Sequence, residues 1–268
     1  MNYYKFRILL SFYFILLLSI SCVEEKPPAK SLHLNELPTI ITNIKKNNEK
    51  IPSFNCKFGI SLTSKEKRIT ADGEAYIDKK RKRIKIILID TLTNETLLDL
   101  IVVNKEISLF LYNTDGGVLI NGNLHKLSLD KYISDFKIEL IDLIQIVSGN
   151  SFIFERINKI VQQEDSDYFY FLLEEQDKVE KLSISKSDKQ IKKLIVYNAG
   201  KEAFRIHYKK YFNFNKFYFP KRSDFFHSKT SSRTIIYISK INFLPKFSNE
   251  IFKLKKYSKA KKIYDTAK

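Results

Sequence analysis

The chain of 268 residues is poor in the residue types from which catalytic and metal sites are usually built. It has two cysteines, four histidines, seven glycines, one methionine and no tryptophan. The histidines lie far apart, so none belongs to the closely spaced pair that is typical of a metal site. No phosphate-binding glycine loop, Gly-x-Ser-x-Gly elbow or Cys-x-x-Cys pair is present. We therefore expect no catalytic residue, no metal, no cofactor and no enzymatic activity.

The N-terminus also lacks an apolar run long enough to cross a membrane. The stretch from Ile8 to Ile20 is shorter than the roughly 20 residues that a spanning helix needs. It follows Lys5 and Arg7 and is followed by the small residue Ser21, which is the three-part pattern of a secretory signal. Residues 1–21 are therefore predicted to be a signal peptide.

A cysteine follows this signal directly. The segment Ser19-Ile20-Ser21-Cys22 resembles the lipobox of bacterial lipoproteins, in which a diacylglycerol is joined to the cysteine sulfur and the signal is cut before it. The resemblance implies a lipid anchor at Cys22, with Ser19 standing where the family usually has leucine. An ordinary cleaved signal and an uncleaved anchor are the alternatives. Residues 22–33 are then a lipidated tether.

An acylated Cys22 leaves Cys56 without a partner for an internal disulfide. Cys56 lies in the stretch FNCKFGISL, where apolar and polar residues alternate with the period of a half-buried strand. We expect it to be a small buried hydrophobe.

The chain is strongly basic. Loss of the signal removes two basic residues and no acidic one, so the formal net charge falls from +17 to +15. In an exported protein this charge indicates anionic lipid headgroups or acidic surfaces, or serves solubility, and we expect no nucleic acid as a partner.

Two segments have the apolar spacing of a helix. Leu34, Leu37, Ile41 and Ile44 predict a helix that ends in the polar run before Pro52. A second apolar stripe, in residues 132–147, predicts an inserted helix that stops at a glycine, residue 149.

From residue 54 onward the remaining pattern has the period of β-strands. In RITADGEAYID the small residues Ala71, Gly73 and Ala75 share one face and leave room for a bulky group above them. The stretches RIKIILID, TLLDLIVV and EISLFLYN follow as further strands, and others continue to Phe243. Together they predict one curled antiparallel sheet of about ten to twelve strands.

This order of elements resembles the LolA/LolB type of periplasmic lipoprotein carriers and outer-membrane lipoprotein receptors. The matching stretches run from residue 34 to 254 and include LFLYNTDGGVLINGN, FYFPKRSDF and YISKINFLPKFSNEIFKL. The resemblance implies a mainly β fold, an incomplete antiparallel β-barrel lidded by two helices, which closes with a strand, an asparagine-containing turn and a short Phe strand. Residues 255–268 follow as a basic C-terminal tail, either solvated or attracted to anionic headgroups.

The resemblance also implies an apolar cavity on the concave face. Its expected lining is Phe58, Ile60, Ile86, Leu88, Leu100, Val102, Leu109, Leu111, Phe136 and Leu140.

Receptors of this type expose an apolar residue, typically leucine, on the loop between the third and fourth strands. Leu92 stands alone among polar residues in the corresponding loop, IDTLTNETLL, and is therefore the candidate for membrane insertion. The alternative is an ordinary exposed leucine with no role.

The resemblance thus implies a bacterial lipoprotein, anchored through Cys22, that binds acyl chains or acylated lipoproteins and takes part in lipoprotein or lipid transfer. The expected location is the periplasmic face of the outer membrane, with a periplasmic carrier protein as a further partner. The alternative is a non-catalytic structural or interaction lipoprotein of the cell envelope, whose barrel is filled by its own side chains.

Overall fold

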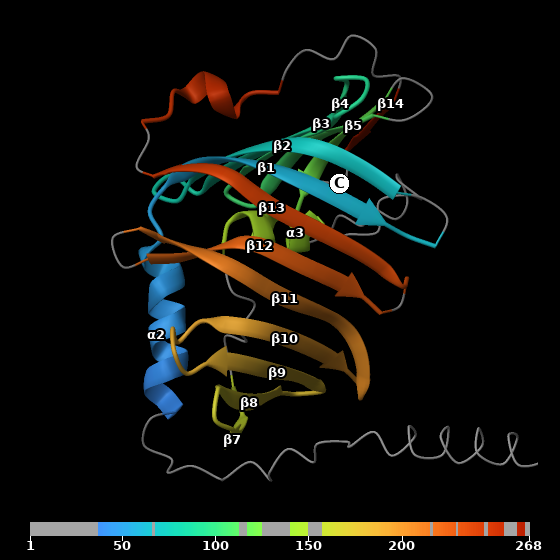
Figure 1. The fold of residues 1–268 in the computed structure, drawn as a ribbon. Coiled ribbons are helices and arrows are strands. Elements are labelled where there is room, and N and C mark those ends of the chain that lie inside the picture. Colours follow the sequence, from blue (N-terminus) through green and yellow to red (C-terminus); the bar gives the residue numbers. More distant parts are fainter. Residues whose placement is uncertain are drawn as a thin grey trace, which may run out of the picture.

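The computed structural model describes residues 37–65, 68–112, 117–124, 140–149, 157–214, 217–228, 230–243, 246–254 and 262–265 (Figure 1). Cys22, the signal and tether around it, and Phe136 lie outside the described residues.

The first half of the chain contributes a helix, six strands and a second helix. These are α2 (Leu37–Lys50), β1 (Phe54–Thr63), β2 (Arg68–Asp78), β3 (Arg83–Asp90), β4 (Thr96–Val103), β5 (Glu106–Leu111), β6 (Val118–Asn123) and α3 (Leu140–Val147).

The second half contributes the remaining strands and one short 3-10 helix. These are β7 (Lys159–Glu164), β8 (Tyr168–Glu175), β9 (Lys178–Ser185), β10 (Ile191–Asn198), β11 (Lys201–Phe214), β12 (Phe217–His227), β13 (Ser232–Phe243), η2 (Asn249–Phe252) and β14 (Lys262–Asp265).

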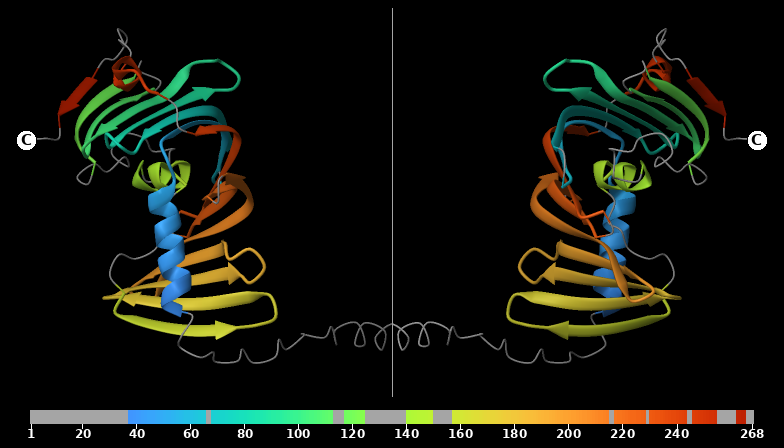
Figure 2. Two further views of the ribbon diagram at one scale, coloured as in Figure 1. Left: turned by 90° about the vertical axis from the view of Figure 1, so that its left-hand side faces the viewer. Right: turned by 90° about the vertical axis from the view of Figure 1, so that its right-hand side faces the viewer.

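All the described strands belong to one sheet with the order β14-β6-β5-β4-β3-β2-β1-β13-β12-β11-β10-β9-β8-β7. Two antiparallel meanders, β1–β6 and β7–β13, meet where β1 pairs with β13. Figure 2 shows the sheet curving around α2 and α3, with β14 and β7 as its two unjoined edges. The predicted fold class, a mainly β, incomplete antiparallel barrel with two helices, is confirmed.

Side chains that alternate along the strands form the core on the concave face. In β1, Phe54, Cys56 and Phe58 are buried, and the residues between them are more exposed. Gly73 of β2 pairs with Phe58, and a Cβ atom at this glycine would lie 2.3 Å from the Phe58 ring. The room that the small residues of β2 were expected to leave is therefore filled by a ring from the neighbouring strand.

The two helices are fastened to the concave face. Ile41 and Ile44 of α2 are buried in the core. The Asn47 side chain accepts a hydrogen bond from the backbone N–H of Tyr218 at 3.4 Å and donates one to its carbonyl at 3.3 Å. α3 ends just before Gly149, which has a φ of +68° and lies against the Phe219 ring, so the predicted glycine stop is confirmed.

Three elements differ from the sequence predictions. β7 was not predicted, because its residues alternate only between exposed and half-buried and its sequence has no apolar alternation. Part of the basic C-terminal segment is a strand, β14, which pairs in parallel with β6. The prediction of a short closing Phe strand, which the resemblance implied, is wrong. Its residues form η2 and pair with no strand of the described sheet. The guanidinium of Arg83 lies 4.2 Å from the centre of the Phe252 ring in η2.

Candidate functional site

The predicted cavity residues come together, but as packed core. The described ones are between 0% and 5% exposed and belong to one cluster: Phe58, Ile60, Ile86, Leu88, Leu100, Val102, Leu109, Leu111 and Leu140. The register explains the grouping, since Ile86, Leu100 and Leu109 are direct cross-strand neighbours. This half of the concave face is thus mostly occupied by the protein's own side chains, and of the predicted residues Val102 borders a smaller pocket at one end of the sheet.

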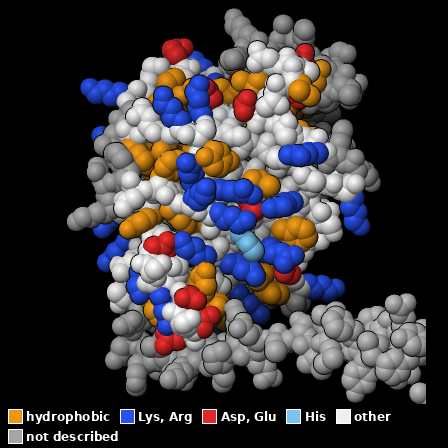
Figure 3. All heavy atoms as spheres, viewed as in Figure 1, with side chains coloured by type: hydrophobic (Ala, Val, Ile, Leu, Met, Phe, Trp, Pro, Cys, Tyr) orange, Lys and Arg blue, Asp and Glu red, His pale blue; other side chains and the backbone are white. Residues whose placement is uncertain are grey.

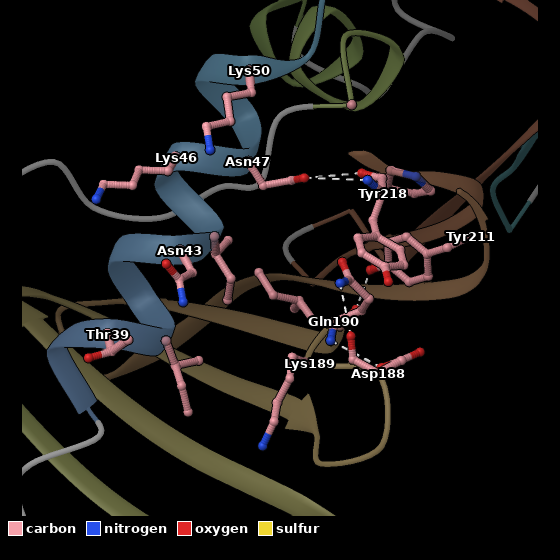
Figure 4. Close-up of a pocket in the computed structure, with 15 residues that line it drawn as sticks. Thr39, Asn43, Lys46, Asn47, Lys50, Asp188, Lys189, Gln190, Tyr211 and Tyr218 are labelled. Carbon is pink, nitrogen blue, oxygen red and sulfur yellow. Dashed lines mark hydrogen bonds between the residues drawn. The ribbon is translucent and has the colours of Figure 1, made fainter. Parts of the chain in front are cut away.

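The large open pocket lies on the other half, between α2 and strands β10–β12 (Figure 4). Its volume is about 850 Å³. The apolar part of its lining is Ile40, Ile44, Ile191, Tyr211, Tyr218 and Pro220. Polar side chains at its rim include Asn43, Lys46, Lys50 and Lys189. In Figure 4 the three lysines point away from the two tyrosines, so charge lies at the edge of the pocket and apolar surface inside it.

Tyr211 is a partly buried tyrosine in the lining of this pocket. The Tyr211 hydroxyl donates a hydrogen bond to the carbonyl of Ile191, and burial raises the pKa of Tyr211 well above its usual value. Nearby, burial opposes ionisation of Asp188, but the Lys192 ammonium and the Gln190 N–H hold the pKa of this carboxyl below its usual value. Lys192 of β10 therefore partly balances the charge of Asp188, and the remaining negative charge adds to the raised pKa of Tyr211.

None of the residues that line this pocket was among the predicted cavity residues. Ile44 was assigned to the apolar stripe of the leading helix, and Ile191 and Tyr211 to ordinary strands. The sequence did contain one signal for this pocket. Ile40 lies beside the stripe that includes Ile41 and Ile44, so the apolar face of α2 is wider than the stripe that packs on the core.

Leu92 lies on the loop between β3 and β4 and is 92% exposed. The loop is a hydrogen-bonded turn, because Asp90 Oδ1 accepts from the backbone N–H of Leu92 at 2.8 Å and from that of Thr93 at 2.9 Å. These two hydrogen bonds lower the pKa of Asp90. An ordered turn therefore presents an isolated apolar side chain to the surroundings.

Cys56 is the small buried hydrophobe that the strand pattern predicted. It is 2% exposed and has no disulfide partner among the described residues. Burial raises the pKa of its thiol to about 12, so the reactive thiolate is not formed near neutral pH.

Similar folds are found among solved structures. No protein-family model and no curated protein sequence matches the chain. A domain named as an outer membrane lipoprotein-sorting protein, from Vibrio parahaemolyticus, superposes with a TM-score of 0.58 at 13% identity, over 80% of this chain and 94% of that one. A LolA superfamily protein from Nitrosomonas europaea gives 0.56 at 13% identity, over 80% and 97%. A DUF1329 family protein from Desulfovibrio piger gives 0.54 at 10% identity, over 80% and 95%.

The fold is LolA/LolB-like. The resemblance seen in the order of elements is confirmed at the level of fold, over the range where these structures cover the chain. In the described part of this LolA/LolB-like chain, no helix is long and apolar enough to cross a membrane, and no three His, Cys, Asp or Glu side chains gather as metal ligands would.

The outer, convex face of the sheet is rich in positive charge. Figure 3 shows a cluster of Lys and Arg side chains on it. On strand β12 of this face Asp224 accepts from Arg222 at 2.6 Å, from Arg233 at 2.7 Å and from Lys209 at 3.3 Å. Although burial opposes ionisation of Asp224, these partners hold the pKa of its carboxyl far below its usual value. His207 lies beside Asp224 in the sheet, and burial together with nearby cations lowers its pKa. One carboxylate therefore organises three cations, and the face remains net positive.

Proposed function

We propose that this protein is a lipid-anchored envelope protein that binds acyl chains, those of lipids or of acylated proteins, in the pocket between α2 and β10–β12. The observation that supports it is the pocket itself, whose volume of about 850 Å³ lies within the roughly 300–1,000 Å³ of ordinary ligand sites. Its apolar wall and charged rim suit an amphiphile whose chain enters and whose polar end stays outside.

The proposed role is lipoprotein or lipid transfer to the outer membrane. An apolar pocket with a charged rim is sufficient for this role. An acyl chain that passes from one apolar site to another changes its free energy little. Passage through water would cost about 0.8 kcal/mol for every exposed CH₂ group. A protein with a fitting pocket lowers this barrier without a metal, a nucleotide or a catalytic residue.

Anchoring belongs to the same proposal. A diacylglycerol at Cys22 would hold the domain at the periplasmic face of the outer membrane, and Leu92 would dip into the bilayer during delivery. A periplasmic carrier protein is then the expected donor of cargo. The lipobox-like segment and the exposed position of Leu92 support these steps.

A pocket-blocking variant tests acyl-chain binding. Asn43 is exposed on α2 and lines the pocket, so Asn43→Trp places a large ring in the opening without disturbing the core. Thr42→Trp is the matched control, because Thr42 is exposed on the same helix and is absent from the pocket lining. Both variants are made in the chain from residue 23 onward, which keeps every described helix and strand.

The measurement is binding of a fluorescent C16 fatty acid, together with mass spectrometry of lipids that copurify with the protein. We expect Asn43→Trp to lower affinity at least about tenfold, whereas Thr42→Trp stays close to the unmodified chain. Equal affinities in the two variants, or an unmodified chain that neither binds the probe nor retains lipid, would contradict the proposal.

The second candidate function is a structural or interaction lipoprotein. It is favoured by the packed half of the concave face, where Phe58, Leu88 and Leu100 are at most 2% exposed and leave no room for a chain. This candidate predicts that the pocket-blocking variant binds partners normally and that no lipid copurifies.

A further inference from the structure

A second pocket, of about 490 Å³, lies at one end of the sheet, where the β2–β3 and β4–β5 turns approach the last turn of α2. Its apolar floor is Ile77, Ile84, Val102 and Leu124. The two turns are joined by a hydrogen bond from the N–H of Asn104 to the carbonyl of Lys82, at 3.2 Å. The pocket is therefore formed by ordered backbone on several sides.

The charged side chains around this pocket are mostly basic. Lys79, Lys82 and Lys105 line it, and none of the three forms an ion pair with a carboxylate in the described part of the chain. Asp78 also lines it, but this carboxylate is committed to Arg83, at 2.7 Å. The three lysines therefore outnumber Glu49, the other acid of the lining.

Lys79 is the most constrained of these cations. Its Nζ donates to the carbonyl of Asn48, at the end of α2, at 2.8 Å, which uses one of the three ammonium hydrogens. Burial lowers the pKa of Lys79 to about 8, as expected of an ammonium that is removed from water without a neighbouring carboxylate. An anion in the pocket would stabilise the ammonium form and raise this pKa again.

Ser148 supplies an independent observation. It follows α3, is 2% exposed and lines this pocket, yet its hydroxyl has no hydrogen-bond partner among the described residues. An unsatisfied buried hydroxyl costs free energy, so such a group indicates a missing partner. The lysine ammonium groups and the Ser148 hydroxyl can all donate hydrogen bonds. A ligand with several acceptor oxygens would therefore satisfy them.

We propose that this pocket binds the phosphate of an amphiphile, with Lys79, Lys82, Lys105 and the Ser148 hydroxyl as donors to the phosphate oxygens. Phosphate offers several acceptor oxygens and a charge that one carboxylate cannot match. The apolar floor lies beside these donors and would cover the first carbons of the attached chain. The inference extends the proposed function to a separate site with its own ligand group.

The test uses short, soluble probes and the chain from residue 23 onward. Dihexanoyl phosphatidic acid carries phosphate and chains, dihexanoylglycerol carries chains alone, and inorganic phosphate carries neither chain nor glycerol. Affinity is measured by isothermal titration calorimetry for the unmodified chain and for Lys82→Gln and Lys105→Gln. Lys80→Gln is the matched control, because Lys80 is exposed in the same turn as Lys82 and is absent from the pocket lining.

We expect phosphatidic acid to bind, and Lys82→Gln and Lys105→Gln each to weaken it about tenfold, since each removes one charged hydrogen bond. Lys80→Gln should change affinity less than about threefold, because only screened, longer-range attraction is lost. Dihexanoylglycerol that binds as tightly as phosphatidic acid, or equal effects of all three variants, would overturn the proposal. Inorganic phosphate that binds as tightly as phosphatidic acid would assign the pocket to free phosphate instead of a lipid headgroup.

Ser148→Ala separates a binding role from a structural one. Without ligand it should leave the melting temperature unchanged or raise it, because a buried unsatisfied hydroxyl is removed. With phosphatidic acid its affinity should fall. A lower melting temperature with unchanged affinity would overturn the role of Ser148. Asn43→Trp, which blocks the pocket beside β10–β12, should leave phosphatidic acid binding here intact, so failure of one site is distinguishable from failure of the other.

Discussion

Replacing Leu92 by glutamine tests whether the β3–β4 loop enters a bilayer. The substitution removes an apolar side chain and adds no charge. The turn itself should persist, because Asp90 holds it through backbone N–H groups that any residue at position 92 provides. Leu92→Phe is the matched control, since it keeps an apolar side chain at the same place.

The expected size of the effect follows from the exposure of Leu92. At 92% exposed, the side chain adds almost nothing to folding, so the free energy of unfolding should change by less than about 0.5 kcal/mol. Burial of a leucine in an apolar phase is worth roughly 1.5–3 kcal/mol. Its loss should therefore weaken binding to a membrane by about 10- to 150-fold.

The assay is flotation of the chain from residue 23 onward with liposomes, in parallel with thermal unfolding of the same samples. Omission of the lipid anchor makes the contribution of the loop measurable. The insertion role is refuted if the glutamine variant binds liposomes as well as the unmodified chain. It is also refuted if the variant melts several degrees lower while binding per folded molecule is unchanged, because Leu92 would then serve the fold.

Three further predictions concern other parts of the chain. Cys22→Ala should abolish incorporation of labelled fatty acid and release the protein from membranes or leave the signal attached; unchanged labelling would exclude Cys22 as the anchor. Gly73→Val should lower stability by about 1–3 kcal/mol in chemical denaturation, because its Cβ would lie 2.3 Å from the Phe58 ring, whereas Gly59→Val, with no atom within 4 Å of the new Cβ, should not. Lys79 binds its proton less tightly in the folded chain, with a pKa of about 8 against 10.5, so the unfolded chain holds more protons between these values and stability should rise with pH across that window. Lys79→Gln should lack this rise, and a rise of equal size in the variant would contradict the assignment.

The elements that local pattern decides were predicted well. The stretches RIKIILID and TLLDLIVV coincide with β3 and β4. The leading helix ends at Lys50, in the polar run, and the inserted helix stops before Gly149. Strand period and helix termination depend on neighbours a few residues away, so the sequence alone carries them.

The elements that escaped prediction lie at the edges of the sheet. β7 reads KIVQQE, with residues that alternate between exposed and half-buried, and β14 lies in a basic segment with little apolar content. An edge strand can be held by backbone hydrogen bonds along one side and needs no strong apolar face. Where a strand lacks an apolar face, its sequence lacks the alternation of apolar and polar residues by which a strand is predicted.

The sequence by itself determined that the chain forms a curled antiparallel sheet with an apolar concave face and two helices, because alternation and helical spacing are local properties. Only the tertiary structure decided which part of that face is solid and which is open. Leu88 and Ile191 are both apolar strand residues, yet only Ile191 lines the large pocket, because α2 crosses the sheet beside strands β10–β12. In the same way Lys79 belongs to the basic run KKRKR, which reads as a solvated turn. Lys79 is nevertheless half-buried, in a pocket that Ser148 also lines, because α2, two turns and the end of α3 meet there. These segments are far apart in the chain, so no local pattern predicts that they meet.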